Sequence, residues 1–248
     1  MKKLFIITGA NGHLGGTIVR MLNGRPVQVR GLVFGDKKKQ DTGSIHYYSG
    51  DVREPETLRP LFEGCEDMET IVIHTAGIID ISNHVSPELY DVNVSGTKNI
   101  LALCREYPVK RLVYVSSVHA IPEQKRGNVT GEIRDFSPDA VVGGYAKTKA
   151  EATREVRRAA QEGLEIAGAV SGKKKLPVLP LWMAKMAAPF IQLHARRKKR
   201  RPLYTAYSLH VLGTGERFSH KKATEELGYH PRDLKVTIRD MVAEMQGA

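Results

Sequence analysis

The chain has 248 residues, 41% of them hydrophobic and 26% charged, and a formal net charge of +11 at pH 7. These values are ordinary for a globular protein that is long enough to bury a full core. The two cysteines, Cys65 and Cys104, are too few for a disulfide framework and are not at metal-ligand spacing. We therefore expect reduced thiols, a cytoplasmic location and no metal site.

The excess positive charge is concentrated in three runs, at residues 37–39, 173–175 and 196–201. The last run is dense enough to bind polyanions without sequence preference. No helix-turn-helix, zinc-finger or RNA-recognition signature accompanies the runs. The pattern favours a solvated basic face and indicates no specific nucleic-acid partner.

Three glycines near the N-terminus have the context of a dinucleotide-binding loop. Residues 3–7 are a short apolar run typical of a buried strand, and apolar residues recur at helical spacing over 16–22. Between these segments, Gly9 permits a tight turn, Gly12 lets the backbone approach a pyrophosphate, and Gly15 lets the helix lie close to the strand. The N-terminus of the helix would then face the phosphates. An ordinary strand-to-helix turn is the alternative.

Strands and helices alternate through the first two-thirds of the chain. The patterns predict strands at residues 27–34, 44–48, 70–74 and 111–115, and helices at 55–62, 89–107 and 145–161. This alternation predicts a Rossmann-type, doubly wound parallel sheet with right-handed crossovers. Cofactor and substrate should bind at the carboxyl ends of its strands.

The last third of the chain has a different character. An apolar stretch at residues 183–193 contains Lys185 and is too short to span a bilayer. Its position beside the basic run suits a membrane surface, but we favour a helix of a small lobe or of a homodimer. Two more helices are predicted at residues 219–227 and 234–245.

Tyr145 and Lys149 are four residues apart and therefore share one face of a predicted helix. A nearby ammonium group favours the phenolate and lowers the pKa of a tyrosine. The pair thus has the properties of a general acid/base, although this spacing is also common on solvated helices. Ser116 and Ser117 end a predicted strand, where a serine hydroxyl could hold a substrate oxygen against the tyrosine.

Taken together, six motifs resemble those of the extended short-chain dehydrogenases/reductases. They occur in that family's order, at residues 8–15, 51–52, 75–77, 93–97, 115–117 and 145–149. The chain looks most similar to the NAD-dependent epimerase/dehydratase group, with features of dihydroflavonol reductases and 3β-hydroxysteroid dehydrogenases. The resemblance covers about the first 165 residues.

The resemblance implies a role for each motif residue. Tyr145 would be the acid/base, Lys149 would hold the ribose hydroxyls, Ser117 would orient the substrate oxygen, and Asn93 would support the proton-relay region. The implied cofactor-binding residues are Gly9, Asn11, Gly12, His13, Leu14, Gly15, Asp36, Asp51, Val52, Ala76, Gly77, Tyr145 and Lys149. We expect no functional role for Asn83, His84 and His119, which lie near these loops.

The sequence leaves the choice between NAD and NADP open. An acidic residue after the second strand accepts hydrogen bonds from ribose hydroxyls and favours NAD, whereas basic residues there favour NADP. Asp36 and the basic run at residues 37–39 both occupy this place. We prefer NAD, through Asp36.

After residue 164 the chain departs from the family pattern. The family continues with a sixth strand and a proline step beside the nicotinamide, but residues 165–173 contain no such step. We therefore expect an NAD(P)-binding Rossmann domain at 1–164 and a truncated, mainly helical remnant of a substrate-binding lobe at 165–248. Either the gene encodes a shortened protein or the sequence omits a segment. In a continuous chain, the sheet should stop after five strands or recruit a poor sixth strand from residues 166–170.

Two functional hypotheses follow. The first is an NAD(P)-dependent oxidoreductase or epimerase/dehydratase that acts on a carbinol or carbonyl group of a small molecule, either a nucleotide sugar or a secondary alcohol. The second is a cofactor-binding regulatory or scaffold protein without turnover, which the shortened nicotinamide side would favour. Turnover by the purified chain discriminates between them.

Overall fold

The computed structural model describes residues 2–35, 40–123, 129–130, 133–169, 217–233 and 236. The helices and strands, in chain order, are β1 (Lys2–Thr8), α1 (His13–Leu22), β2 (Gln28–Val33), β3 (Ile45–Ser49), α2 (Pro55–Leu58), η1 (Arg59–Leu61), β4 (Met68–His74), α3 (Pro87–Tyr90), η2 (Asp91–Ser95), α4 (Gly96–Glu106), β5 (Val109–Val115), η3 (Val118–Ala120), β6 (Val129–Thr130), η4 (Pro138–Ala140), α5 (Gly144–Gln161), β7 (Ile166–Ala169), β8 (Arg217–Phe218) and α8 (Lys221–Leu227).

Six strands form one parallel sheet in the order β3-β2-β1-β4-β5-β7. The chain runs outward from β1 to β3, returns to place β4 beside β1, and continues outward to β7. This order confirms the predicted Rossmann-type sheet. The strands are added in one direction from β1 and in the opposite direction from β4, and sheets of this kind bind their ligands at the point between β1 and β4 where the order reverses.

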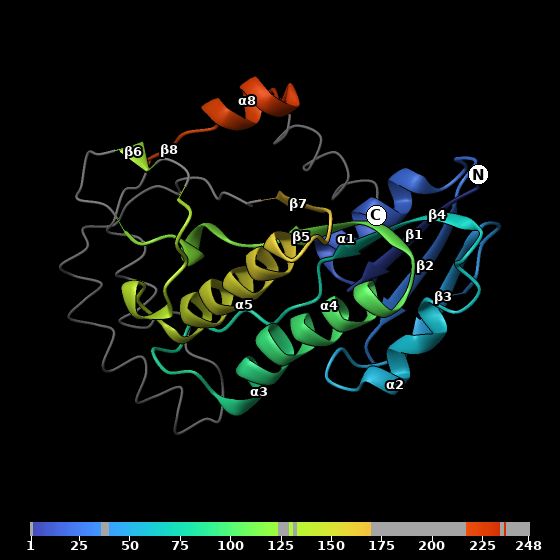
Figure 1. The fold of residues 1–248 in the computed structure, drawn as a ribbon, viewed down its shortest axis with the longest axis horizontal. Helices are drawn as coiled ribbons and strands as arrows, with labels where there is room; N and C mark the ends of the chain where they lie inside the picture. The colour runs from blue at the N-terminus through green and yellow to red at the C-terminus, as the bar shows by residue number, and fades with distance from the viewer. Residues whose placement is uncertain are drawn as a thin grey trace. The chain divides into compact units, whose positions relative to one another are not determined.

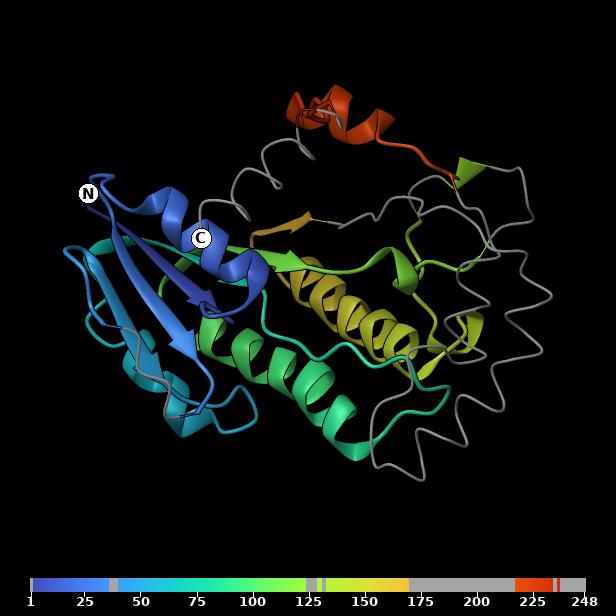
Figure 2. The same cartoon turned by 180° about the vertical axis from the view of Figure 1, so that it is seen from behind.

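Each face of the sheet has its own apolar core, because side chains alternate along β1. Leu4 and Ile6 belong to the core that also contains residues of α4 and α5, whereas Ile7 belongs to the core that contains Val19 of α1. Figure 1 shows α4 and α5 across one face of the sheet, and Figure 2 shows α1 across the other. The three β1 side chains are completely buried, so the strand that carries the glycine loop is central to the domain.

The long helix predicted at residues 89–107 is interrupted in the structure. It consists of α3, the π-helical segment η2 and α4. Apolar spacing cannot distinguish one wider turn from an ordinary helical turn, and such turns are frequent at functional sites. Gly96 follows the wide turn and packs closely on Val52, since a Cβ atom on Gly96 would lie 2.7 Å from Val52 Cγ2.

A sixth strand, β7, pairs in parallel with β5 at the edge of the sheet. The pairing extends from Leu112 opposite Ile166 to Val115 opposite Ala169. This is the second of the two arrangements predicted for a continuous chain. The domain boundary predicted at residue 164 stays a prediction, with β7 lying just beyond it.

The chain divides into two compact units. The larger comprises Met1–Glu123 and Arg134–Thr214, and the smaller comprises Gln124–Ile133 and Gly215–Ala248. In the smaller unit β6 pairs in parallel with β8, and α8 falls within the helix predicted at 219–227. The predicted helix at 183–193, and nearly all of that at 234–245, lie outside the described residues. In the described part of the chain, no helix is long and apolar enough to cross a membrane.

Candidate functional site

The turn between β1 and α1 has no room for side chains at two of its glycines. Gly9 has a φ of 69°, in the left-handed region that favours glycine. A Cβ atom on Gly15 would lie 2.2 Å from the Gly9 carbonyl oxygen and 2.8 Å from Thr75 Oγ1. Close packing of α1 on the turn therefore requires glycine at position 15, as predicted.

The other loop residues predicted to bind the cofactor are open to solvent. The four exposed residues are Asn11 and Gly12, which precede α1, and His13 and Leu14, which begin it. Gly12 is the N-cap residue of α1, and no acidic residue occupies the first turn of the helix. The N-terminus of α1 is thus an accessible, electropositive place for a phosphate group.

A buried histidine connects the glycine turn to the neighbouring loops. Thr8 Oγ1 lies 2.7 Å from His74 Nδ1, and His74 Nε2 lies 3.1 Å from Thr97 Oγ1. The Thr97 hydroxyl donates its proton to the Asn93 carbonyl oxygen, so its oxygen accepts from Nε2–H of His74. We therefore assign the Nε2–H tautomer, in which Nδ1 accepts from Thr8. Burial, reinforced by the charge of Lys149, lowers the pKa of His74 to about 3 and keeps the ring neutral.

Ala76 and Gly77 lie in the loop after β4, directly beside the glycine turn. The Ala76 N–H donates to Thr8 Oγ1 at 3.1 Å. A Cβ atom on Gly77 would lie 3.1 Å from Asn93 Oδ1, so the loop also approaches the π-helical segment closely. The structure thus brings these two predicted residues to the switch point of the sheet.

Asn93 fixes the loop after β4 against α5. Its Oδ1 accepts from the Ile78 N–H at 2.8 Å, and its Nδ2 donates to the Ile78 carbonyl oxygen and to Thr148 Oγ1, at 3.0 and 3.1 Å. Thr148 lies on α5 between Tyr145 and Lys149. The side chain of Asn93 therefore holds the helix that carries the predicted catalytic pair.

Asp51 and Val52 lie in the loop after β3, at the carboxyl edge of the sheet. The Asp51 carboxylate accepts from the Arg53 N–H at 2.9 Å, from Arg53 Nε at 2.8 Å and from Arg53 Nη2 at 2.5 Å. Burial favours a higher pKa for Asp51, but these hydrogen bonds outweigh it and lower the pKa, which keeps the carboxylate ionised. Val52 is buried against Gly96, and its carbonyl oxygen accepts from Asn99 Nδ2 at 2.9 Å.

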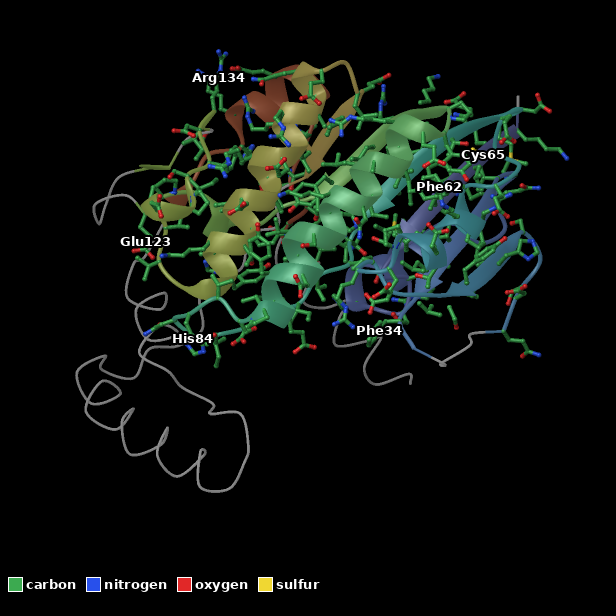
Figure 3. The ribbon with its side chains drawn as sticks, turned by 60° about the horizontal axis from the view of Figure 1, so that its bottom comes forward. Phe34, Phe62, Cys65, His84, Glu123 and Arg134 are labelled. Atoms are coloured by element: carbon green, nitrogen blue, oxygen red, sulfur yellow. The ribbon has the colours of Figure 1, made fainter. Side chains whose placement is uncertain are left out.

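Tyr145 begins the first turn of α5 beside the serine that ends β5. Ser117 accepts from the His119 N–H at 3.3 Å, and the rings of His119 and Tyr145 meet edge to face with 6.1 Å between their centroids. The loop that carries His84, labelled in Figure 3, packs on the start of α5. A Cβ atom on Gly144 would lie 2.1 Å from the His84 carbonyl oxygen, so glycine is required there. Ser117 and Tyr145 come together as predicted, with the ring of His119, which was expected near these loops, against the tyrosine.

Lys149 is buried one helical turn after Tyr145. Its Nζ donates to the Val115 carbonyl oxygen at 2.7 Å and lies 4.6 Å from the centroid of the Tyr114 ring. Burial lowers the pKa of Lys149 to about 8. The Ser116 hydroxyl forms a hydrogen bond of 2.6 Å with Thr153 Oγ1, further along the same helix.

Lys149 does not lower the pKa of Tyr145 in the way that we expected. We predicted a lowered pKa, but burial raises it, and the nearby Ser117 hydroxyl opposes the rise only in part. The direction differs because loss of hydration disfavours the phenolate.

The Tyr114 hydroxyl is fully buried and has no hydrogen-bond partner among the described residues. The Thr97 and Thr153 hydroxyls are close enough to oppose the rise that burial causes in the pKa of Tyr114, but they are not in hydrogen-bonding geometry with it. Because an unpaired buried hydroxyl is destabilising, we expect Tyr114→Phe to raise the free energy of unfolding by about 1 kcal/mol. Urea unfolding checks this value, and a decrease would show that the hydroxyl has a partner.

Three contributors to the site were not predicted, namely Arg53, His74 and Tyr114. Asp36, on which the expected preference for NAD rests, lies outside the described residues. In the part of the chain that the structure describes, no group of three or more histidine, cysteine, aspartate or glutamate side chains is placed to hold a metal ion.

The fold and the site define a Rossmann-fold protein of the short-chain dehydrogenase/reductase type. The model of the 3-beta hydroxysteroid dehydrogenase/isomerase family matches residues 6–169, which is more than half of the chain. The chain belongs to this family, in agreement with the resemblance seen in its motifs.

Several curated relatives match the same region. Sterol demethylase protein B of Methylococcus capsulatus is 32% identical over 165 residues, 65% of this chain and 48% of that protein. A putative dihydroflavonol 4-reductase of Synechocystis is 31% identical over 168 residues, with 67% and 48% covered. Human 3 beta-hydroxysteroid dehydrogenase type 7 is 30% identical over 136 residues, with 51% and 36% covered. The chain therefore spans about half the length of the first two relatives and 36% of the length of the human one.

Solved structures show the same fold. The crystal structure of gox2253 superposes with a TM-score of 0.72 at 21% identity and covers 99% of this chain and 98% of that one. A short-chain dehydrogenase/reductase superfamily protein from Agrobacterium tumefaciens, solved with bound NAD, gives a TM-score of 0.53 at 22% identity, with 67% and 48% covered. At these identities the comparison shows the fold alone.

Proposed function

We propose that this protein is an NAD(P)-dependent oxidoreductase that transfers hydride between the nicotinamide ring and a carbinol carbon of a small molecule. The observation that carries the proposal is the placement of Ser117, Tyr145 and Lys149 at the carboxyl edge of a sheet whose central strand ends in the glycine turn. The residues present fit a dinucleotide, because Gly15 leaves no side chain between α1 and the turn and the N-terminus of α1 is exposed. When bound, the cofactor would supply the acceptor or donor of hydride.

The protein's own groups would handle the proton. In oxidation, Tyr145 as phenolate takes the hydroxyl proton while the carbon loses hydride, and in reduction the phenol returns it. Ser117 would donate a hydrogen bond to the substrate oxygen and hold it near Tyr145. The ammonium of Lys149, with a pKa of about 8, is mostly charged at neutral pH and would bind ribose hydroxyls.

We propose a ring alcohol or ketone as the substrate, in preference to a nucleotide sugar. The names of the relatives, which include hydroxysteroid dehydrogenases and a dihydroflavonol reductase, support this class. Ile79 and Val142 are 61% and 50% exposed, on the loops that follow β4 and precede α5. These apolar side chains suit an apolar substrate better than a diphosphate. We propose NAD as the cofactor, in keeping with the NAD complexes among the structural relatives.

The test measures binding first and turnover second. NADH and NADPH are titrated into the purified chain, and cofactor reduction is then followed with a 3β-hydroxysteroid, a flavonoid alcohol and UDP-glucose. We expect NADH to bind and one of the ring alcohols, but not UDP-glucose, to be oxidised. Binding without any turnover would instead support the regulatory hypothesis, and no binding of either dinucleotide would reject the proposal.

A further inference from the structure

We propose that Tyr114 is a positioning residue for Lys149: the face of its ring and the neighbouring Val115 carbonyl oxygen hold the lysine ammonium where its remaining protons can reach the ribose of a dinucleotide. That the ammonium binds ribose rests on the proposed function. The contact between the ring and the ammonium does not, so it can be tested in the protein without a cofactor. Tyr114 lies outside the predicted motifs, directly before the one at residues 115–117.

The Lys149 ammonium has lost most of its hydration. The residue is only 7% exposed, and an ammonium group has three protons to donate. Among the described residues, the structure gives Nζ one hydrogen-bond acceptor, the Val115 carbonyl oxygen at 2.7 Å. Two protons therefore remain for other acceptors. A single carbonyl oxygen does not replace the water that a charged group loses on burial, so a second source of stabilisation is needed.

The face of the Tyr114 ring supplies a second attraction. Nζ of Lys149 lies over the ring, 4.6 Å from its centroid. An aromatic face attracts a cation within about 6 Å of the centroid, and the attraction is stronger where water is excluded. Tyr114 is 2% exposed, so water is excluded here. The ring and the carbonyl oxygen belong to consecutive residues of β5, and the end of one strand therefore makes both contacts with the ammonium.

The Tyr114 ring is itself fixed in the core. It belongs to the apolar cluster that also contains residues of α4 and α5. Its centroid lies 5.8 Å from that of the His74 ring, with 30° between the two planes. The Tyr114 hydroxyl has no hydrogen-bond partner among the described residues. The contact with Lys149 therefore depends on the ring and not on the hydroxyl.

The titratable groups beside this contact are neutral at neutral pH. Burial lowers the pKa of His74, on β4, to about 3 and raises the pKa values of Tyr114, on β5, and Tyr145, on α5. None of the three therefore carries a charge that could replace the attraction of the ring. Burial also lowers the pKa of Lys149 to about 8, so the ammonium is charged by a narrow margin. Loss of the attraction should make it release its proton at a lower pH.

Urea unfolding of the protein without cofactor, measured from neutral to alkaline pH, tests the contact. Lys149 releases its proton at a lower pH in the folded protein than in the unfolded chain, so the free energy of unfolding rises as the pH passes the pKa of the folded state. In Tyr114→Leu, which removes the ring, this rise should begin about one pH unit lower. Tyr114→Phe is the matched control, because it keeps the ring and should keep the wild-type onset. Lys149→Met should abolish the rise.

A second substitution guards against misfolding of Tyr114→Leu. Tyr114→pentafluorophenylalanine keeps the ring but inverts its quadrupole, so it should also move the onset to lower pH. NADH affinity, which requires the ammonium, should fall at the same lower pH in both variants. An onset that neither change moves, or that Tyr114→Phe moves equally, would overturn the inference and leave the proposed function standing. Shifted onsets in a protein that binds neither NADH nor NADPH would support the contact and overturn the proposed function.

Discussion

Tyr145→Phe is expected to lower kcat by about 100- to 10,000-fold, the usual contribution of general acid–base catalysis. The change removes one oxygen atom and leaves a ring that still meets His119 edge to face. Tyr145 is also among the residues implied to contact the cofactor, but Lys149 and the glycine turn stay untouched, so most of the NADH affinity should be retained. Steady-state kinetics with the best substrate, together with an NADH titration, test both statements.

Tyr107→Phe is the matched control for this prediction. Tyr107 follows α4, is half-buried and packs on Phe62 of the apolar core with 5.4 Å between the ring centroids. Its hydroxyl has no place in the proposed chemistry, so kcat should stay at the wild-type value. If Tyr145→Phe and Tyr107→Phe had the same kcat, the proposed role of Tyr145 would be lost.

The raised pKa of Tyr145 also predicts a pH dependence. Oxidation of an alcohol requires the phenolate, so its rate should rise as the pH increases toward the pKa of Tyr145. Reduction requires the phenol and should persist toward neutral pH. In Tyr145→Phe the residual oxidation should lose this rise. Rates measured in both directions across the alkaline range check the sign.

The fold could be predicted because its signals are local. The strand predicted at residues 3–7 extends from Lys2 to Thr8, and the helix predicted at 145–161 begins one residue earlier, at Gly144. Alternation of strands and helices then limits the topology to a parallel sheet with crossovers. The π-helical segment at Asp91–Ser95 could not be predicted in this way, since it leaves the apolar spacing nearly unchanged.

The candidate site could be predicted only in part. Tyr145 and Lys149 are recognised from a spacing of four residues, and Ser117 from its place at the end of a strand. The hydrogen bond between Thr8 and His74 joins residues 66 positions apart, and no local pattern announces it. The pKa of Tyr145 was predicted in the wrong direction for a related reason, because burial is a property of the tertiary structure.

A second large effect is expected at His74, whose neutral state makes stability depend on pH. Its pKa is about 3 in the folded protein and 6.5 in the unfolded chain. Between these values the unfolded state binds one more proton, so the free energy of unfolding falls as the pH decreases. The slope is at most about 1.4 kcal/mol per pH unit, which gives a loss of about 2 kcal/mol between pH 6.5 and pH 5.

The other described groups with shifted pKa values titrate outside the interval from pH 6.5 to pH 5. The carboxyl groups of Asp41, Asp51 and Glu69 have lowered pKa values, so their contribution to stability is lost only as the pH falls below about 4. Lys149 has a pKa of about 8 in the folded protein and 10.5 in the unfolded chain, so it makes stability depend on pH only between these values. Among the groups with shifted pKa values in the described part of the chain, the interval from pH 6.5 to pH 5 therefore isolates His74.

Urea unfolding of the wild-type protein and of His74→Gln at pH 6.5 and pH 5 tests this prediction. The variant should be less stable than the wild-type protein at pH 6.5. Because glutamine does not titrate in this range, its free energy of unfolding should fall by about 2 kcal/mol less than that of the wild-type protein between pH 6.5 and pH 5. His13→Gln, which replaces an exposed histidine, serves as the matched control and should follow the wild-type protein. Equal losses in the wild-type protein and in His74→Gln would mean that His74 is protonated in the folded state. Nε2 and Nδ1 would then both be donors, and the Thr8 hydroxyl could no longer donate to Nδ1. The link from the glycine turn through His74 to Asn93 would have to be assigned differently.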